Sequence, residues 1–487
     1  MRKIVVLRDA GYLFTSDAAI IAIGLFGQII LTHSLATNEY GSWVIAIDLL
    51  GIFFLLVHFG IPDVLGRDVP RIGREILGIL RFYTSFQLIS TIFIAPLGVF
   101  LLLNLLSPEL SLITIIFLSV SVSSQILGAT FRIILRSLGE ARTEGILRVI
   151  DRGSVVACYL VNSSFLESSI EGFAIATAIG PIFTLPLAYL RSSRVLRELN
   201  SDRPSLPETR SSGRVLLLRA LPFVLTSGLL LVINRVDKIV LMFFTGPEAV
   251  AVFNVGWLCY FAGCSVPQAF MSILLPEFGS IRGKDGLIRD TTRNSYSTLE
   301  WFVPPGIIVG SFVAYYGIPF LFPEDYTAWS QDFGGSAVAV FFVLLSAWVM
   351  VTLAAPFFTN IQAGENPWIY TSMGLVMIIV DVIAAIILVP FLGIIGAAWA
   401  TVVTRTATLA FLFFYSGGPS LYPEIGRRIL LIGSFSVLFS VASAKALAGS
   451  IPEVTIFYSI LAMSLGAILL GWKPAYILEQ IREIREL

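Results

Sequence analysis

Charged residues are scarce in this chain of 487 residues: Asp, Glu, Lys and Arg make up 13% of it, against about 25% in an average soluble domain. The 32 acidic and 32 basic residues balance, so the chain has no bulk basic field that would attract nucleic acid. There are only two histidines and three cysteines, and the cysteines fall in apolar stretches, which indicates neither a metal site nor a disulfide framework. These shortages argue against an ordinary soluble enzyme and against a nucleic-acid partner.

Apolar residues are abundant instead, at 56% of the chain. Because a helix needs about 20 apolar residues to cross a bilayer, the sequence predicts an all-α polytopic membrane protein with about 14 transmembrane helices. Six expected spans precede a polar break: Gly11–Leu31, Gly41–Phe59, Ile76–Leu103, Leu112–Ile133, Leu147–Phe165 and Gly172–Leu190. The others follow it: Val215–Phe244, Val250–Leu275, Leu299–Phe320, Gly334–Phe358, Trp368–Val389, Ile395–Tyr415, Ile429–Ala446 and Thr455–Gly471.

The distribution of Lys and Arg sets the expected orientation, because these residues are retained in cytoplasmic loops. With the N-terminus inside, the expected inner segments hold most of the 32 Lys and Arg and the expected outer loops hold none. We therefore expect a multi-pass protein of the cell (cytoplasmic) membrane whose N- and C-termini are both cytoplasmic. Several tryptophans lie near expected span ends, as an interfacial aromatic belt predicts: Trp43, Trp257, Trp301, Trp368 and Trp472.

A polar, arginine-rich segment at residues 191–214 separates two similar halves, and its arginines are expected to face anionic headgroups of membrane lipids. The sixth expected span of each half starts with the pattern G-x-A-x-A-T, in Gly172–Thr177 and in Gly396–Thr401. An even number of spans per half makes the halves parallel repeats, although Gly and Ala are common in membrane helices anyway. The expected organisation is an N-terminal lobe (1–190), a cytoplasmic linker (191–214), a C-terminal lobe (215–416), and two further spans with a cytoplasmic tail (417–487).

Ionisable residues inside the expected spans are the main functional signal. A charge at mid-bilayer costs about 2.5–3.5 kcal/mol and therefore faces a partner or a polar cavity. The residues in question are Asp17, Asp48, Arg152, Arg235, Asp237, Lys238, Asp381 and Arg405. Local pairing is the simpler explanation for Asp237, which lies between Arg235 and Lys238. Arg405 has no acidic residue three or four positions away, so it is the strongest candidate for a cation that faces a substrate.

Three short stretches resemble the recurrent signposts of a transporter family. They are Leu35–Gly41 followed by Phe59–Ile61, Ala220–Pro222 leading to Arg235–Asp237, and Val389–Ala398. Over essentially its whole length the sequence resembles the polysaccharide flippases, which are the O-antigen and lipid-linked oligosaccharide exporters of the multidrug/oligosaccharidyl-lipid/polysaccharide superfamily. The resemblance implies two six-helix lobes in a V shape around a central cavity, two C-terminal helices, and flipping of an isoprenoid-linked oligosaccharide to the outer leaflet by alternating access. Glycosyltransferases or a polymerase of the same pathway are then candidate partners.

A polar sugar with a (pyro)phosphate head cannot cross hydrocarbon unaided, so such a flippase needs cations in its cavity that replace the water of the head. The candidate substrate-binding residues are Arg405, Arg235, Lys238, Arg152, Asp48 and Asp17. Three other arginines lie at inner helix ends and are expected to snorkel to the interface: Arg132, Arg136 and Arg148.

A coupling-ion site is the second candidate. Counted from the outer ends of their spans, Asp237, Asp381 and Thr401 lie about six to nine residues deep, which places them in one layer roughly 9–14 Å below the surface. Two carboxylates with hydroxyl and backbone oxygens suit Na⁺, and the same pair can instead share a proton. The alternative is an ion pair between Asp381 and Arg405 or Arg235. Apart from Na⁺ or H⁺ as coupling ion, no cofactor is expected.

Other functions are weighed against these residues. An enzyme is disfavoured because the expected outer loops are short and no Gly-rich phosphate loop ending in Gly-Lys-Ser/Thr is present. A multidrug and toxin cation antiporter of the same superfamily would need mainly acids and aromatics, with twelve spans typical. The basic residues in the spans and the two extra spans favour an anionic lipid-linked sugar, while a flippase for peptidoglycan lipid II would share both features.

Overall fold

The computed structural model of the chain describes residues 2–68, 76–106, 110–165, 168–200, 221, 224, 228–229, 231–281, 283–364 and 367–448. These residues form helices and no β-strand, apart from an isolated bridge between Ser330 and Gly335. Ten helical stretches among them are long and apolar enough to cross a membrane. The predicted class, an all-α multi-pass membrane protein, is therefore confirmed. The count of about 14 spans stays a prediction, because the last expected span (455–471), most of the linker and part of the seventh span lie outside the described residues.

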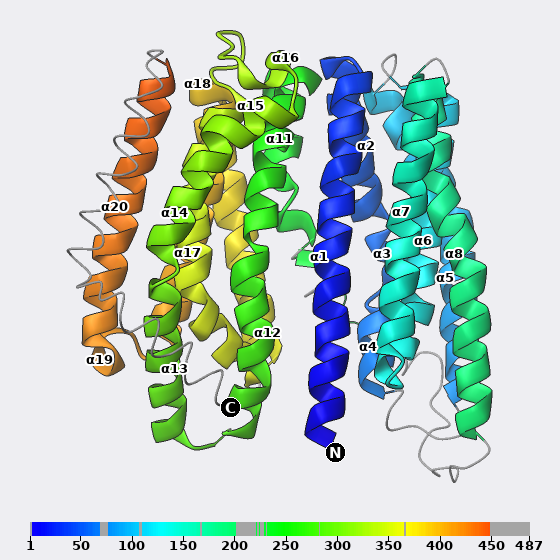
Figure 1. Cartoon of the computed structure of the whole chain (residues 1–487), viewed down its shortest axis with the longest axis horizontal. Helices are drawn as coiled ribbons and strands as arrows, with labels where there is room; N and C mark the ends of the chain where they lie inside the picture. The colour runs from blue at the N-terminus through cyan, green and yellow to red at the C-terminus, as the bar shows by residue number, and fades with distance from the viewer. Residues whose placement is uncertain are drawn as a thin grey trace. The chain divides into compact units, whose positions relative to one another are not determined.

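The first of two compact units comprises Met1–Asn254 and Pro367–Ile379. Its helices (Figure 1) are α1 (Arg2–Ser34), α2 (Thr37–Phe53), α3 (Leu55–His58), α4 (Ile61–Asp68), α5 (Ile76–Leu106), α6 (Leu112–Ser137), α7 (Ala141–Phe165), α8 (Ile170–Asn200) and α10 (Val236–Thr245). It also contains the first residues of α11 (Pro247–Gly263) and of α18 (Pro367–Tyr415). Helix α6 packs against α8, and α7 packs against both α1 and α8.

Hydroxyl groups join the helices of this first unit. The Ser121 hydroxyl donates to the Thr177 carbonyl at 2.9 Å, and the hydroxyls of Tyr159 and Thr177 lie 2.7 Å apart. Thr177 ends the first G-x-A-x-A-T pattern, near the start of α8. Because small residues let membrane helices approach closely and hydroxyls can then bond between them, this pattern has a local packing role whatever its origin.

The second unit comprises Val255–Asn366 and Val380–Leu487. Its described helices are the rest of α11 and α18, α12 (Ser265–Ser280), α13 (Asp285–Glu300), α14 (Val303–Phe312), the π-helix η1 (Val313–Gly317), α15 (Ile318–Leu321), α16 (Glu324–Thr327), α17 (Ala337–Ala363), α19 (Gly418–Leu421) and α20 (Pro423–Ala448). The predicted division into lobes at residues 1–190 and 215–416 stays a prediction.

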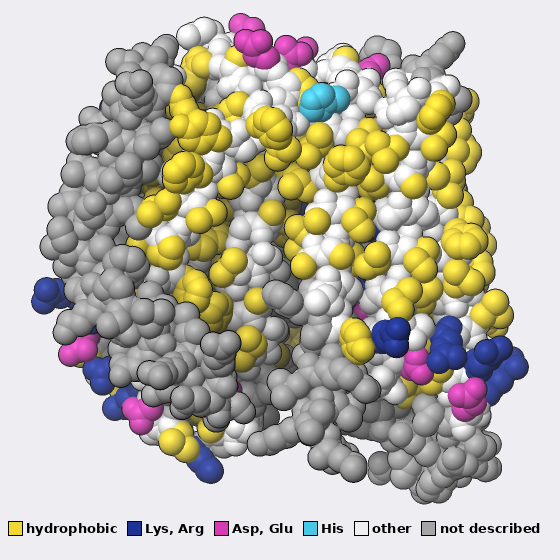
Figure 2. Space-filling view, in the orientation of Figure 1, with side chains coloured by type: hydrophobic (Ala, Val, Ile, Leu, Met, Phe, Trp, Pro, Cys, Tyr) yellow, Lys and Arg dark blue, Asp and Glu magenta, His cyan; other side chains and the backbone are white. Residues whose placement is uncertain are grey.

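Helix α17 is the core of the second unit. It is apolar all round, and 94% of its most apolar window is buried inside the protein, against 11% for α5 of the first unit. A helix with no polar face is stable only when neighbours cover every side. Here α12, α13, α14 and α20 pack against it. The exposed apolar surface of α5 instead suits contact with lipid, and Figure 2 shows hydrophobic side chains over the middle of both units and Lys and Arg near one end of each.

Two helical stretches are interrupted where the sequence predicts continuous spans. The second expected span is divided into α2 and α3, and Phe59 ends α3 in the left-handed region with φ of 44°. Asn234 and Arg235 form a turn directly before α10, with Arg235 at φ −132° and ψ −16°. In α18, by contrast, Gly393 at φ 57° and ψ −133° separates the two halves at a position where the sequence predicts a boundary between two spans. Backbone groups freed at such breaks need partners other than lipid, so broken membrane helices mark protein-lined or water-lined regions.

Candidate functional site

The break before α10 brings three of the predicted substrate residues together within the first unit. Asp48, in the middle of α2, pairs with Lys238 at 2.8 Å between Oδ2 and Nζ, and with Arg235 at 3.6 Å between Oδ1 and Nε. Arg235 also donates from Nη1 to the Asp48 carbonyl at 2.7 Å. Its guanidinium lies directly over Gly51, where a Cβ would collide with it. The unwound turn therefore brings two cations, Arg235 and Lys238, to one carboxylate of α2.

A chain of hydrogen bonds continues from this cluster through buried side chains. Lys238 donates to Asn254 Oδ1 at 3.0 Å, and Asn254 donates from Nδ2 to the Tyr40 hydroxyl at 2.8 Å. Tyr40 in turn donates to Gln28 Oε1 at 2.7 Å. Lys238, Asn254 and Tyr40 are 4%, 3% and 0% exposed, so these members of the network are buried. It links α1, α2, α10 and α11.

Sequence reasoning missed Asn254 and Tyr40 as members of this cluster. A signal was present, because an amide in an apolar helix usually hydrogen-bonds to another helix. Arg235 and Lys238 both pair with Asp48 on α2, and the expected local pairing of Asp237 with these two cations stays a prediction. Asp237 itself is buried at 5% exposure on α10, and its predicted role in ion coupling stays a prediction.

Two other predicted substrate residues lie in a separate charged region of the first unit. Asp17 on α1 forms an ion pair with Arg148 on α7. Arg148 lies 3.6 Å from Glu144, which is 3% exposed and also accepts a hydrogen bond from Arg136 at 2.9 Å. These arginines therefore hold α1, α6 and α7 together.

Arg152, the other residue in this region, is exposed on α7. Its neighbour Asp151 pairs with Arg132 on α6, at 3.5 Å between Oδ2 and Nη1. Arg132 is thus an ion-pair partner of a buried carboxylate instead of a residue that only snorkels to the interface. The structure does not place Arg152 or Asp17 with the Asp48 cluster.

A second cationic site, built around Arg405 on α18, lies in the second unit. The Arg405 guanidinium hydrogen-bonds the Tyr260 side chain, with the Cys264 thiol and the Asp381 carboxylate close by. Asp381, only 1% exposed, accepts a hydrogen bond from the Thr404 hydroxyl at 2.8 Å. Its other oxygen, Oδ2, is buried without a hydrogen-bond partner. Asp381 and Arg405 lie close enough to interact electrostatically, while the pairing of Asp381 with Arg405 or Arg235 and the coupling-ion site both stay predictions.

Thr404 is the hydroxyl next to Asp381, whereas the predicted Thr401 lies one turn earlier on α18 and donates to the Ala397 carbonyl at 3.4 Å. A carboxylate oxygen without a hydrogen bond beside a hydroxyl is a ligand set of the kind that Na⁺ or a proton uses. Asp237 belongs to the first unit and Asp381 to the second, and their meeting at one ion stays a prediction.

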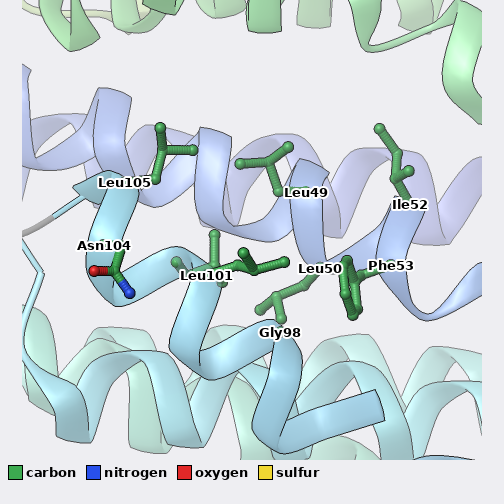
Figure 3. A pocket seen from close by; sticks show the side chains of 9 residues that line it. Leu49, Leu50, Ile52, Phe53, Gly98, Leu101, Asn104 and Leu105 are labelled. Atoms are coloured by element: carbon green, nitrogen blue, oxygen red, sulfur yellow. The ribbon is translucent and has the colours of Figure 1, made fainter.

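An apolar pocket of about 450 Å³ lies between α2 and α5 in the first unit. Figure 3 shows leucines, Ile52 and Phe53 on its walls, with Asn104 as the polar lining residue. The Asn104 amide donates to the Phe100 carbonyl of its own helix at 2.8 Å. A pocket with this lining suits hydrocarbon and offers no charge to a phosphate, so it is not the site for a polar headgroup.

Buried charges at helix breaks in a multi-pass helical protein define the class of a membrane transporter fold, and comparison with known proteins agrees. The profile of the polysaccharide biosynthesis protein family matches residues 6–278. This match extends over more than half of the chain, so the chain belongs to that family, and the resemblance seen in the sequence is confirmed. No curated protein matches the sequence.

Solved structures with the same fold are those of transporters and flippases, not of enzymes. The fold is similar to that of the lipid II flippase MurJ in an inward closed conformation, with 13% identity, a TM-score of 0.66, and coverage of 94% of this chain and 98% of the flippase. A mutant of the Vibrio cholerae MATE transporter VcmN has 14% identity, a TM-score of 0.57, and coverage of 85% and 95%. An outward-facing multidrug resistance MATE family transporter of the MOP superfamily has 14% identity, a TM-score of 0.56, and coverage of 85% and 94%.

Proposed function

We propose that the protein is a flippase that moves an isoprenoid-(pyro)phosphate-linked oligosaccharide from the cytoplasmic to the outer leaflet. The observation that carries this proposal is the cluster of two cations, Arg235 and Lys238, around Asp48 at a broken membrane helix. Arg405 supplies a further cation in the second unit. Membership of the polysaccharide biosynthesis family supports the sugar-linked substrate.

The physical role of these cations is to replace water around the phosphate groups. A phosphate oxygen accepts charge-assisted hydrogen bonds from a guanidinium or an ammonium group, and these are roughly twice as strong as neutral ones. Asp48 pairs with both Arg235 and Lys238 and so holds the two cations next to each other. The isoprenoid tail needs no such site, because it stays in the hydrocarbon of the bilayer.

The proposal includes about 14 spans, two parallel six-helix lobes and alternating access to a central cavity. It also includes cytoplasmic N- and C-termini in the cell membrane. The orientation is supported by the gathering of Lys and Arg near the end of the first unit at which α1 begins (Figures 1 and 2), since basic residues stay on the cytoplasmic side. Glycosyltransferases or a polymerase of the same pathway remain proposed partners.

We propose cation coupling through Asp237, Asp381 and Thr401, with Thr404 as a further ligand. The buried, partly unpartnered carboxylate of Asp381 supports this part of the proposal. Either Na⁺ or H⁺ suits such oxygens.

The test is the leaflet distribution of a lipid-linked oligosaccharide in proteoliposomes that contain the purified protein. Arg405→Ala and Arg235→Gln are each expected to slow flipping by about tenfold or more, because one charge-assisted hydrogen bond is worth about 1.5–3 kcal/mol. Arg293→Ala is the matched control. Arg293 is 58% exposed and pairs at 3.1 Å with Glu424, itself 71% exposed, so its loss is expected to leave flipping unchanged.

A multidrug cation antiporter and a lipid II flippase are the alternatives, and both are favoured by the fold they share with this chain. A wild-type protein that leaves the lipid-linked oligosaccharide in the inner leaflet but extrudes organic cations would establish the antiporter. A wild-type protein that flips lipid II and not other lipid-linked oligosaccharides would establish the second alternative.

A further inference from the structure

Helix α11 presents an aromatic pair next to Arg405 within the second unit. The rings of Trp257 and Phe261 stack with centroids 5.0 Å apart and an interplanar angle of 13°. Trp257, Tyr260, Phe261 and Cys264 are spaced i, i+3, i+4 and i+7, so they share one face of the helix. Tyr260 hydrogen-bonds the Arg405 guanidinium, and Cys264 lies close to that guanidinium. The aromatic pair and the guanidinium therefore lie within about one helical turn of each other.

The depth of Trp257 does not fit the interfacial belt expected from the sequence. It lies ten residues after Pro247, where the membrane stretch that contains α11 begins. At 1.5 Å per residue this is about 15 Å of rise, half of a hydrocarbon core of about 30 Å. Trp257 is half-buried and Phe261 is 42% exposed, so the stacked pair reaches the protein surface at mid-membrane depth.

An aromatic face beside a cation matches the chemistry of a phosphorylated sugar. A pyranose ring has an apolar C–H face, which stacks on an aromatic ring, and a polar edge of hydroxyls, which needs hydrogen-bond donors. A guanidinium beside that ring binds phosphate oxygens or hydroxyls. An organic cation would be repelled by Arg405, and a bare lipid tail would offer the guanidinium no hydrogen-bond acceptor. Among these occupants, the sugar of an anionic lipid-linked saccharide fits the charge and the apolar surface together.

We propose that the Trp257–Phe261 pair is the platform on which the first sugar of the substrate stacks, while Arg405 binds the adjoining phosphate or hydroxyl groups. This inference rests on the proposed flippase function and adds a sugar-binding surface to it. The platform discriminates saccharide-bearing lipids from the same lipids without sugar.

The test uses the full-length protein in lipid nanodiscs and two probes. One probe is an isoprenyl diphosphate that carries a single hexose, and the other is the same isoprenyl diphosphate without sugar. Trp257→Leu is expected to weaken binding of the first probe by about 5- to 10-fold, the scale of one aromatic contact, and to leave binding of the second unchanged. Trp257→Phe keeps a ring and is expected to stay within about 2-fold of wild type for both probes.

The matched control is a second stacked pair, Phe312 and Tyr316, with centroids 6.0 Å apart, and 57% and 54% exposed. It has the same i, i+4 spacing, but the segment Val303–Gly317 that contains it carries no charged residue. Phe312→Leu is expected to bind both probes like wild type.

The proposal is overturned if Trp257→Leu retains the preference for the hexose probe, or if it weakens both probes equally. The second outcome would make the pair a packing or lipid contact. A wild-type protein that binds neither probe would instead refute the flippase function itself, so the two failures are distinguishable.

Discussion

Lys238 and Asp48 form an ion pair of 2.8 Å between α10 and α2, with side chains that are 5% and 10% exposed. Removing one partner of a buried pair leaves an uncompensated charge, whereas replacing both can be nearly neutral. This asymmetry makes the pair a structural element of the first unit as well as a part of the proposed site. It also predicts how single and double substitutions differ.

Asp48→Asn is expected to destabilise the purified protein by about 3 kcal/mol, because Lys238 loses its carboxylate in a region without water. The double variant Asp48→Asn with Lys238→Met is expected to recover most of this loss. Thermal unfolding in detergent measures both. Glu424→Gln is the control, since its pair with Arg293 is exposed and is worth less than about 1 kcal/mol. Equal losses in the single and double variants would contradict the prediction.

The hydroxyl of Tyr40 joins two helices, because it accepts from Asn254 and donates to Gln28. Tyr40→Phe keeps the ring but leaves the amide groups of both partners without that bond. The expected cost is about 1–2 kcal/mol in the free energy of unfolding. Tyr316→Phe, at a side chain that is 54% exposed, is expected to change unfolding little. A Tyr40→Phe protein as stable as wild type would show that other groups replace this hydroxyl.

Glu140, in the turn between α6 and α7, makes the free energy of unfolding depend on pH. The Thr143 hydroxyl, which donates to it at 2.6 Å, and Arg191, at 3.0 Å, hold the pKa of Glu140 below its ordinary 4.5. A carboxyl whose pKa is lowered by folding stabilises the folded state above its unfolded pKa, and this contribution disappears as pH falls through the folded pKa. Glu140→Gln should therefore lower the free energy of unfolding near neutral pH by less than about 1 kcal/mol, because the pair with Arg191 is so exposed.

Below the folded pKa of Glu140, wild type and Glu140→Gln are expected to unfold at the same temperature. In a Thr143→Val background the pKa of Glu140 is expected to lie closer to its unfolded value. The pH range over which Glu140 and Gln at this position differ in stability should therefore become narrower. A difference between wild type and Glu140→Gln that stays constant down to about pH 3 would assign the effect to packing instead of ionisation.

The membrane class and many helix positions could be predicted from the sequence because hydropathy acts locally. The breaks within the helices could not be predicted from the sequence. The second and seventh expected spans are interrupted at Phe54 and at Asn234, where no proline or glycine marks a break. Tertiary contacts keep these turns in place, and a hydropathy window cannot detect them. Helix α7 shows the opposite limit, since its many charged residues keep it outside the ten apolar stretches although it is fully helical.

The candidate site was predictable as a set of residues but not as a set of pairs. Charge inside an apolar span identifies Asp48, Arg235 and Lys238, because burying an ion is costly anywhere in the chain. Which ions meet depends on the packing of α2 against α10, which a comparison of sequence neighbours does not show. Thr404 was missed for the same reason, since its contact with Asp381 crosses between the two halves of α18.

Asp381 provides the last prediction, which concerns coupling. Its Oδ1 accepts from Thr404, and its Oδ2 is buried without a hydrogen-bond partner. Asp381→Asn removes the charge that would hold Na⁺ or H⁺, so transport in proteoliposomes is expected to lose its dependence on the cation gradient. Thr404→Val removes one hydroxyl ligand and is expected to weaken the apparent cation affinity by about tenfold, the worth of one hydrogen bond to a charged group. Asp332→Asn, at an exposed position, is the control. Unchanged cation dependence in both Asp381→Asn and Asp237→Asn would exclude these carboxylates from coupling and would leave Asp381 as the counter-ion of Arg405.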